Sequence, residues 1–445
     1  MKVRTYRDRM SAATDEPVPL RRNRDFQLLW AGQAVSLLGS QISKIAYPLL
    51  VLAMTGSPAK AGIAGFAAML GYLLFPLPAG ALADRHDRKR IMIACDVIRL
   101  AAIGSIVVAF WAADLTYAQI LLAGFAEGSA TIFFNLAERS ALPLLVHPTQ
   151  RPTAISQNEA RTNLAQLAGP ALGGALFGLS RAAPFAADAL SYLASLVTLP
   201  FIRTPMQAAR GSRGSRGSRP QAPRNLRAEL REGLAFTWRQ PFLRYASIFG
   251  AAVNLLLQVV VLGLIVLGRH DGASPAQIGL IVGCFGVGGL AGALAAPWFQ
   301  RKIPAGLTIT GCMWIWAALL ALIAVVHAVA WLYPVVAVIG FVGPAWNVSA
   351  QTFRMQITPN ELMGRTSSVS LQVAWGVIPL GSLLAGFLLQ VLSPSAAMAV
   401  VAGGMAVTAI AATALAPVRN AGRKTPGASG QAGPAGPAAA AQPAG

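Results

Sequence analysis

The chain has 445 residues, of which 55% are hydrophobic and only 12% are charged, and its formal net charge is +20. About a quarter of the residues of a soluble globular protein are charged, so this composition indicates an integral membrane protein. The positive charge does not indicate nucleic-acid binding, because the basic residues lie between apolar runs without the base-reading or stacking groups that such a surface needs.

The cysteines exclude two further kinds of structure. Cys95, Cys284 and Cys312 all fall inside apolar runs, without CxxC spacing and without clustered histidines. An odd number of cysteines in this pattern argues against a disulfide framework and against a metal site. We therefore expect no metal and no other cofactor.

The chain opens with a charged, proline-containing segment, 1–25, which is too long and too charged for a signal peptide and is interpreted as a cytoplasmic tail. Twelve mainly apolar runs follow, most of them at least the roughly 20 residues that a helix needs to cross the hydrocarbon layer. They lie at 28–53, 61–83, 91–113, 117–137, 157–179, 184–202, 244–267, 276–299, 305–327, 330–352, 368–391 and 395–417. The sequence thus predicts an all-α integral membrane fold of twelve transmembrane helices.

The loops between these runs differ in basic residues. With the N-terminus in the cytoplasm, the inward connections hold nineteen Lys and Arg, whereas the outward ones hold Lys60, Arg181 and Arg269. Lys and Arg accumulate on the cytoplasmic side of membrane proteins. We therefore predict a multi-pass protein of the plasma (inner) membrane with both termini in the cytoplasm.

An internal repeat divides the spans into two blocks of six. AGALA occurs at 79–83 and again at 291–295, each time at the end of the second span of a block. Duplicated halves are common in transporters. The predicted division is an N-terminal half at 26–202, a basic linker with an interfacial helix at 203–243, a C-terminal half at 244–418, and a disordered cytoplasmic tail at 419–445.

Ionisable side chains inside spans are costly in hydrocarbon, so they indicate function. In span one, Lys44 either reaches toward Glu127 or extends outward to the interface. Asp96 and Arg99 lie one turn apart in span three, and we expect them to form a structural pair. Glu127 lies ten residues into span four, close to mid-membrane. It is predicted to bind a proton or cation, with a salt bridge or a helix–helix hydrogen bond as the alternative.

Spans five and six carry further polar groups. We expect Glu159 and Arg161 to join a cytoplasmic charge network, and Asp188 to pair with another group or to meet water. Span five also contains GPALGG, with Gly169, Pro170, Gly173 and Gly174. From residue chemistry alone, this motif predicts a kinked helix that packs closely on its neighbours.

Taken together, these residues resemble the major facilitator superfamily. The loop between spans two and three reads G-x-L-A-D-R-x-x-R-K-R from Gly80 to Arg90. RNRDFQLLWAGQAVSLLGS, NEARTNLAQLAGPALGG and PFAADALSYLASL are similar to the bacterial drug and siderophore exporter branch, which contains macrolide efflux proteins and the enterobactin exporter. The resemblance covers about residues 25–418.

The resemblance implies that the loop is part of a gate, formed by Gly80, Asp84, Arg85, Arg88 and Lys89. Asp84 matches the acid that braces the start of span eleven, here 366–368, when the cytoplasmic side is shut, and Arg85 matches its charge-relay partner. For Arg88, Lys89 and Arg90 we favour a simpler role as topology signals. Asp87 stands where the superfamily loop has Gly. In the superfamily, a motif like GPALGG is associated with antiporters.

In the superfamily, spans one, four, seven and ten line a central cavity. The resemblance therefore places six polar residues around the substrate path: Lys44, Tyr47, Glu127, Asn254, Gln258 and Asn347. So few polar groups suit amphiphilic or aromatic compounds better than sugars. We predict a monomeric, proton-coupled exporter of drug-like or siderophore-like small molecules. A nutrient symporter of the same fold and a non-transporting receptor or scaffold are the alternatives, and no enzyme motif is present.

Overall fold

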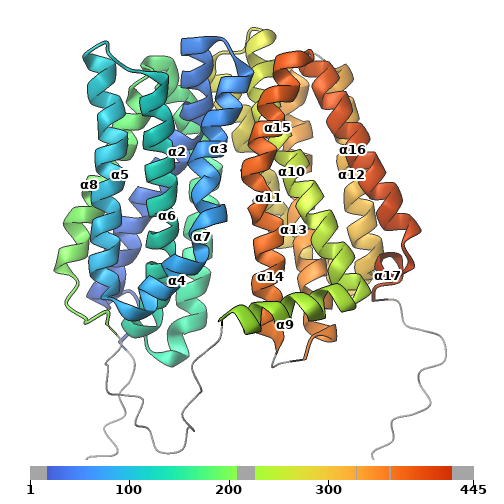
Figure 1. The fold of residues 1–445 in the computed structure, drawn as a ribbon, viewed down its shortest axis with the longest axis horizontal. Coiled ribbons are helices and arrows are strands. Elements are labelled where there is room, and N and C mark those ends of the chain that lie inside the picture. The colour runs from blue at the N-terminus through green and yellow to red at the C-terminus, as the bar shows by residue number, and fades with distance from the viewer. Residues whose placement is uncertain (1–17, 208–225, 327, 360–361, 423–445) are drawn as a thin grey trace, which may run out of the picture.

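The computed structural model describes residues 18–207, 226–326, 328–359 and 362–422. Within these ranges every regular element is a helix, so the predicted all-α fold is confirmed. Figure 1 shows two groups of helices side by side, with the N-terminal elements in one group and the C-terminal elements in the other. The RGSRGSRGSR run of the linker and most of both predicted tails lie outside the described residues.

The helices of the N-terminal group begin at side-chain caps or at prolines, which satisfy or remove the unpaired N–H groups of a first turn. Asn23, Ser57 and Thr116 each accept a hydrogen bond from a first-turn N–H. The group consists of α2 (Arg24–Thr55), α3 (Pro58–Leu74), α4 (Pro76–Arg85), α5 (Arg88–Trp111), α6 (Tyr117–Leu145), α7 (Arg151–Leu179) and α8 (Ala183–Thr198), with short 3₁₀ turns η1 (Pro148–Gln150) and η2 (Leu199–Phe201).

The C-terminal group follows a short amphipathic helix that crosses its lower end in Figure 1. That helix is α9 (Leu226–Arg239), and its Gly233 packs against the backbone of Arg365. The group consists of α10 (Pro241–His270), α11 (Pro275–Lys302), α12 (Ala305–Val325), α13 (Val329–Ile357), α14 (Met363–Gly376), α15 (Ile378–Val391), α16 (Pro394–Ala414) and α17 (Ala416–Arg419).

In the described residues, ten helical runs are long and apolar enough to cross a membrane. Two of the twelve predicted spans are missing from these ten, for different reasons. The span predicted at 61–83 is divided between α3 and α4, and the span predicted at 157–179 lies in α7, whose first half is rich in Gln, Asn, Glu and Arg. Both segments are helical and pack inside the molecule.

Proline breaks one long segment in each group. Pro76 follows the break between α3 and α4, and Pro379 follows the break between α14 and α15. Proline has no backbone N–H and cannot continue the hydrogen bonding of a preceding helical turn. The outer halves, α3 and α15, pack against each other, so the two interrupted segments face one another between the groups. Paired interruptions of this kind accompany substrate sites in transporters.

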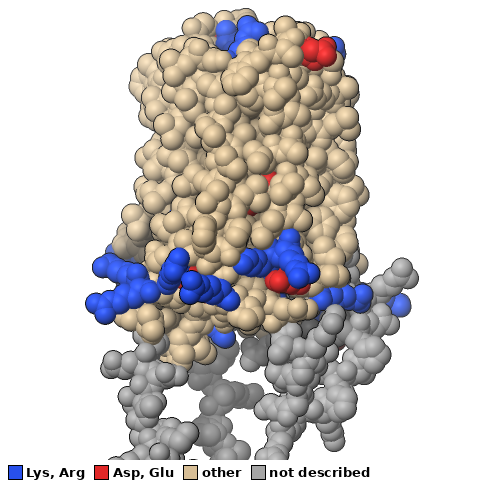
Figure 2. All heavy atoms as spheres, turned by 90° about the vertical axis from the view of Figure 1, so that its left-hand side faces the viewer, with Lys and Arg blue, Asp and Glu red and all other residues tan. Residues whose placement is uncertain are grey.

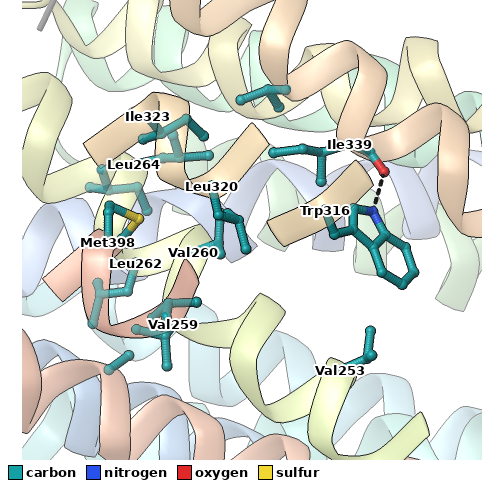
Figure 3. Close-up of a cluster of buried hydrophobic side chains, with 14 of the residues drawn as sticks. Val253, Val259, Val260, Leu262, Leu264, Trp316, Leu320, Ile323, Ile339 and Met398 are labelled. Atoms are coloured by element: carbon teal, nitrogen blue, oxygen red, sulfur yellow. Dashed lines mark hydrogen bonds between the residues drawn. The ribbon is translucent and has the colours of Figure 1, made fainter. Parts of the chain in front are cut away.

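Aliphatic side chains fill the interior of the C-terminal group. Figure 3 shows Val259, Val260 and Leu264 of α10 meeting Leu320 of α12 and Met398 of α16. The indole of Trp316 donates a hydrogen bond to the carbonyl of Ile339 over 2.9 Å, so this buried polar group is satisfied. The buried ion pairs of the described structure, in contrast, lie in the N-terminal group.

Basic side chains gather at one end of the bundle. Figure 2 shows a belt of Lys and Arg at the lower end, where α4 lies, with a wide zone above it in which only traces of Asp or Glu are visible, and few charges at the opposite end. The belt matches the charge asymmetry of the sequence. Below, "inner" means this basic end and "outer" means the opposite end.

Candidate functional site: a polar network inside the N-terminal half

Glu127 is the centre of a polar network between α2, α6 and α8. Its Oε1 accepts a hydrogen bond from the hydroxyl of Tyr192 over 3.0 Å. The same Tyr192 oxygen lies 2.9 Å from the hydroxyl of Ser40 on α2. Glu127 is only partly exposed, and it forms no ion pair within the described residues. A carboxyl with neutral hydrogen-bond partners and little solvent can exist in either protonation state, as a proton carrier must.

Lys44 lies on α2 with an exposed side chain, close enough to Glu127 for electrostatic attraction but without an ion pair between them in the described structure. This arrangement agrees with part of each prediction made for Lys44. The Lys44 ammonium group attracts the Glu127 carboxylate electrostatically, but the two side chains do not form an ion pair in the described structure.

The Asp96–Arg99 ion pair forms the inner part of the network. Both side chains are buried on α5, and the hydroxyl of Ser195 donates to the second oxygen of Asp96 over 2.6 Å. Gln33 on α2 donates in turn to Ser195 over 2.8 Å. These bonds satisfy most of the polar atoms of a costly buried pair.

Aromatic rings connect the two parts of the network. The Arg99 guanidinium lies 4.3 Å from the ring centre of Phe134 and 4.6 Å from that of Tyr192, and so makes cation–π contacts with both. Tyr192 therefore contacts Arg99 through its ring and Glu127 through its hydroxyl. Neither Tyr192 nor Ser195 was singled out from the sequence. Their spacing from Asp188, four and seven residues, is the helical signal that could have identified them.

Asp188 was expected to pair with another group or to meet water. It is fully buried on α8, its Oδ1 accepts from the Ser191 hydroxyl over 3.3 Å, and its Oδ2 has no hydrogen-bond partner within the described residues. Asp188 forms no ion pair in that part of the chain. The reason is the close packing of α8 on α2 at Gly39, where a Cβ would lie 2.8 Å from Asp188 Oδ1.

Arg161 has a partner that the sequence analysis did not name. Its guanidinium donates to Glu138 of α6 over 2.8 Å, and both side chains are largely buried. Glu159, in contrast, is exposed on α7. Arg161 therefore forms an ion pair, as expected, but its acidic partner belongs to α6 and is not Glu159 of its own helix.

The loop between α4 and α5 has a mainly structural role in this conformation. Asp87, which replaces the Gly of the superfamily loop, is the N-cap of α5 and accepts from the N–H of Lys89 over 2.9 Å. Arg88 donates to the carbonyl of Met206, and the Lys89 ammonium donates to the carbonyls of Pro200 and Ile202. Arg88 and Lys89 therefore hold the end of α8, which is more than the topology signal expected of them.

The other gate residues lie on α4, which packs on α6. Arg85 is exposed, and the space around the position of a Gly80 Cβ is open. The side chain of Asp84 lies outside the described part of the structure. Thr366, in the segment that Asp84 was expected to brace, is buried and donates to the carbonyl of Leu362 in its own helix, α14.

The glycines of GPALGG allow α7 to approach two helices. A Cβ on Gly169 or Gly173 would collide with α2, at Gln41 and at Ile42 respectively. A Cβ on Gly174 would lie 2.8 Å from the Cα of Gly279 on α11, in the other half. Pro170 lies inside α7, and its carbonyl meets the same Gly279. The predicted close packing is present.

The contacts between the two halves lie toward the outer end. Besides the contact of Gly174 with Gly279, Gly62 of α3 packs on Gly386 of α15. Ser57, at the outer start of α3, donates to Gln390 over 2.8 Å. These contacts hold the two halves together at the outer end.

The polar residues that were expected to line one cavity make two different kinds of contact. Some form hydrogen bonds between helices of the C-terminal group, and others lie near Glu127 in the N-terminal group. Asn254 donates to the carbonyl of Ala374 over 2.9 Å, and Gln258 donates to Ser382 over 3.1 Å, so both tie α10 to the interrupted segment α14–α15. Tyr47 is buried with its ring edge-on to Phe185, whereas Asn347 is exposed on α13. Of the expected set, Lys44 and Tyr47 of α2 both interact electrostatically with Glu127 of α6.

Aromatic rings gather around the break between α3 and α4. Phe75, at the break between α3 and α4, contacts Phe125 and Phe133 of α6, with ring centres 6.2 and 5.7 Å apart. Tyr72 of α3 faces Trp375 of α14 across the two halves, with ring centres 6.3 Å apart. A cavity of about 360 Å³ lies elsewhere, at the outer end, where Arg181 and Arg269 line it together with apolar side chains such as Phe177.

A family model described as "transmembrane secretion effector" matches residues 16–428. The chain belongs to this family of the major facilitator superfamily. Macrolide efflux protein A of Streptococcus pyogenes is 27% identical over 367 residues, covering 81% of this chain and 88% of that protein. The multidrug efflux pump Tap of Mycobacterium tuberculosis is 26% identical over 370 residues, covering 81% and 86%.

Solved structures of other major facilitator transporters share the fold. The nucleoside transporter NupG aligns with a TM-score of 0.70 at 16% identity, over 88% of this chain and 98% of that one. A bacterial homologue of the iron transporter ferroportin aligns with a TM-score of 0.65 at 15% identity in its inward-facing state, over 89% of this chain and 100% of that one. Its outward-facing state gives 0.56. This member of the secretion effector family is thus a multi-pass membrane transporter and not an enzyme.

Proposed function

We propose that the chain exports amphiphilic, drug-like or siderophore-like small molecules by alternating access, in exchange for protons. The observation that carries the proposal is Glu127, a carboxyl in the apolar interior whose fixed partner is the neutral hydroxyl of Tyr192. A carboxylate without a paired cation is costly at this depth, so gain and loss of a proton are the natural ways to change its charge.

Alternating access is supported by the packing between the halves. The outer contacts of Gly174 with Gly279 and of Gly62 with Gly386 have to separate when the molecule opens outward. The breaks at Pro76 and Pro379 let the inner segments α4 and α14 move separately from α3 and α15. Asp84 and Arg85 then act as a brace that forms when the inner side closes, because only contacts specific to one state shift the population.

The substrate class follows from the aromatic side chains at the break between α3 and α4. Phe75, Phe125 and Phe133 offer ring faces and edges there. Such a surface favours large, partly apolar compounds over sugars, which need many polar partners. The relatives, a macrolide efflux protein and a multidrug efflux pump, agree with this class and with the direction of transport.

We also propose an oligomeric state, a membrane orientation and a division into two halves. The chain works as a monomer in the plasma membrane, with the basic end and both termini in the cytoplasm. The two halves comprise 26–202 and 244–418, and the linker 203–243 includes α9, which the Arg365–Glu232 ion pair attaches to α14.

Transport assays with and without an uncoupler test the proposal. Cells that produce the protein should accumulate less of at least one compound in an amphiphilic panel, and the uncoupler should abolish the difference. In proteoliposomes, Glu127→Gln should still bind that compound but should lose pH-driven export, because a carboxamide of the same size cannot carry a proton. Glu159→Gln is the matched control, since Glu159 is an exposed acid of the same half.

Two outcomes contradict the proposal. Full pH-driven export by a correctly inserted Glu127→Gln protein would remove Glu127 from the coupling mechanism. Higher accumulation in producing cells, abolished by the same variant, would indicate an importer such as a nutrient symporter.

A further inference from the structure

A second carboxyl, that of Asp188, is more deeply buried than Glu127 and less well paired. Asp188 is 0% exposed on α8. Ser191 of the same helix donates to Oδ1 over 3.3 Å, and Oδ2 has no hydrogen-bond partner in the described structure. A carboxylate in this environment leaves a large desolvation cost uncompensated.

The groups that surround Asp188 are hydroxyls with unused capacity. On α2, the Ser43 hydroxyl faces the carboxyl outside ordinary hydrogen-bond geometry. The Tyr47 hydroxyl, one helical turn farther along α2, is also buried without a partner in the described residues. A hydroxyl oxygen can accept a hydrogen bond from a protonated carboxyl, so either group could satisfy the acid form.

The charged groups near Asp188 do not supply a counter-ion. From α5, Arg99 interacts electrostatically with Asp188, but its guanidinium is paired with Asp96. From α6, Glu127 adds a second negative group, and α8 itself adds Tyr192. Lys44 of α2 interacts with Glu127, and the part of α7 beside α8, 175–179, is apolar.

We infer that Asp188 is a second proton-binding site of this transporter, coupled to Glu127 by electrostatic repulsion. In the acid form its Oδ2–H donates to the Ser43 or Tyr47 hydroxyl. Loss of the proton leaves a carboxylate next to Glu127, and two neighbouring buried carboxylates resist ionising together. Deprotonation of one site therefore favours protonation of the other. This inference rests on the proposed proton coupling and adds a second carrier to it.

Infrared difference spectroscopy of the purified full chain tests the site without a transport assay. Spectra recorded between acid and alkaline pH should contain two bands of protonated carboxyl groups in the interior. Glu127→Gln should remove one band and Asp188→Asn the other, and each variant should shift the band that remains. Tyr47→Phe should shift the Asp188 band because it removes a neighbouring hydroxyl, and it provides a readout if Asp188→Asn does not fold.

Transport provides the second readout. The rate of pH-driven export in proteoliposomes should fall about tenfold or more in Asp188→Asn, because the carboxamide cannot exchange a proton. Asp114→Asn should transport normally, since Asp114 is an exposed acid near the outer end of α5.

The two hypotheses fail in distinguishable ways. Normal export by Asp188→Asn together with loss of export by Glu127→Gln overturns the second site and leaves the proposed function intact. Normal export by Glu127→Gln overturns the proposed function itself. A carboxyl band of Asp188 that responds to Na⁺ at constant pH, and not to pH, would show a metal-cation site and would overturn the inference.

Discussion

At the scale of single residues, the buried Asp96–Arg99 pair makes a testable contribution to stability. Asp96→Ala leaves the Arg99 guanidinium buried between Phe134 and Tyr192 without its counter-ion. Removing one partner of a buried pair costs about 3 to 5 kcal/mol. We expect the variant to unfold at a clearly lower temperature in detergent, as measured by the fluorescence of its exposed thiols or tryptophans.

Arg90→Ala is the control for this prediction, because Arg90 is 88% exposed and lies 3.9 Å from Asp87. Exposed ion pairs contribute little, so its unfolding temperature should stay close to that of the wild type. The double variant Asp96→Asn/Arg99→Gln should recover part of the loss, since neither charge is then left alone. Equal unfolding temperatures for Asp96→Ala and Arg90→Ala would show that the buried pair does not stabilise the fold.

At the scale of elements, the contact between α7 and α11 should control which side of the transporter is open. A Cβ on Gly174 would lie within 3.0 Å of the Gly279 backbone, so Gly174→Ala has to push the outer ends of the two helices apart. This penalty applies only where the helices touch, and the population should shift toward the outward-facing state. Thiol labelling of Ala171→Cys by an impermeant reagent from outside should become several-fold faster.

Gly178→Ala, on the same helix, is the matched control because nothing lies within 4 Å of its Cβ position. It should leave the labelling rate of Ala171→Cys unchanged. An unchanged rate in Gly174→Ala as well would mean that the α7–α11 contact does not distinguish the two states.

At the scale of the whole molecule, the charge belt predicts the orientation in the membrane. In a background without Cys95, Cys284 and Cys312, we expect His86→Cys to react with an impermeant thiol reagent only after the cells are permeabilised. Asp114→Cys should react in intact cells. Both positions are exposed, and they lie at opposite ends of α5. Labelling in the reverse order would contradict the predicted topology.

Much of the fold could be predicted from the sequence because membrane insertion is decided segment by segment. A stretch of about 20 apolar residues has to satisfy its own backbone in the hydrocarbon layer, and a helix does so without any other part of the chain. Nearly all described residues of the twelve predicted segments are helical. The segments that differ from a single long apolar helix are the one in α7, where composition is mixed, and the one that proline divides between α3 and α4.

Part of the candidate site was also visible in the sequence. Glu127, Asp96 and Arg99 stand out because ionisable side chains are rare within apolar spans. The spacing of three residues between Asp96 and Arg99 places them on one face of a helix, so their ion pair is a local property of α5.

Contacts between distant segments were decided only by the tertiary structure. Arg161 pairs with Glu138, 23 residues away, and not with nearby Glu159, because the rotation of α7 against α6 determines which side chains face each other. In the same way, the packing of α8 on α2 at Gly39 leaves Asp188 buried beside hydroxyls and without a cation. The sequence by itself determined which residues lie in the membrane and which of them are ionisable. The rotation and close approach of the helices determined their partners, since these depend on the packing of surfaces that are far apart in the chain.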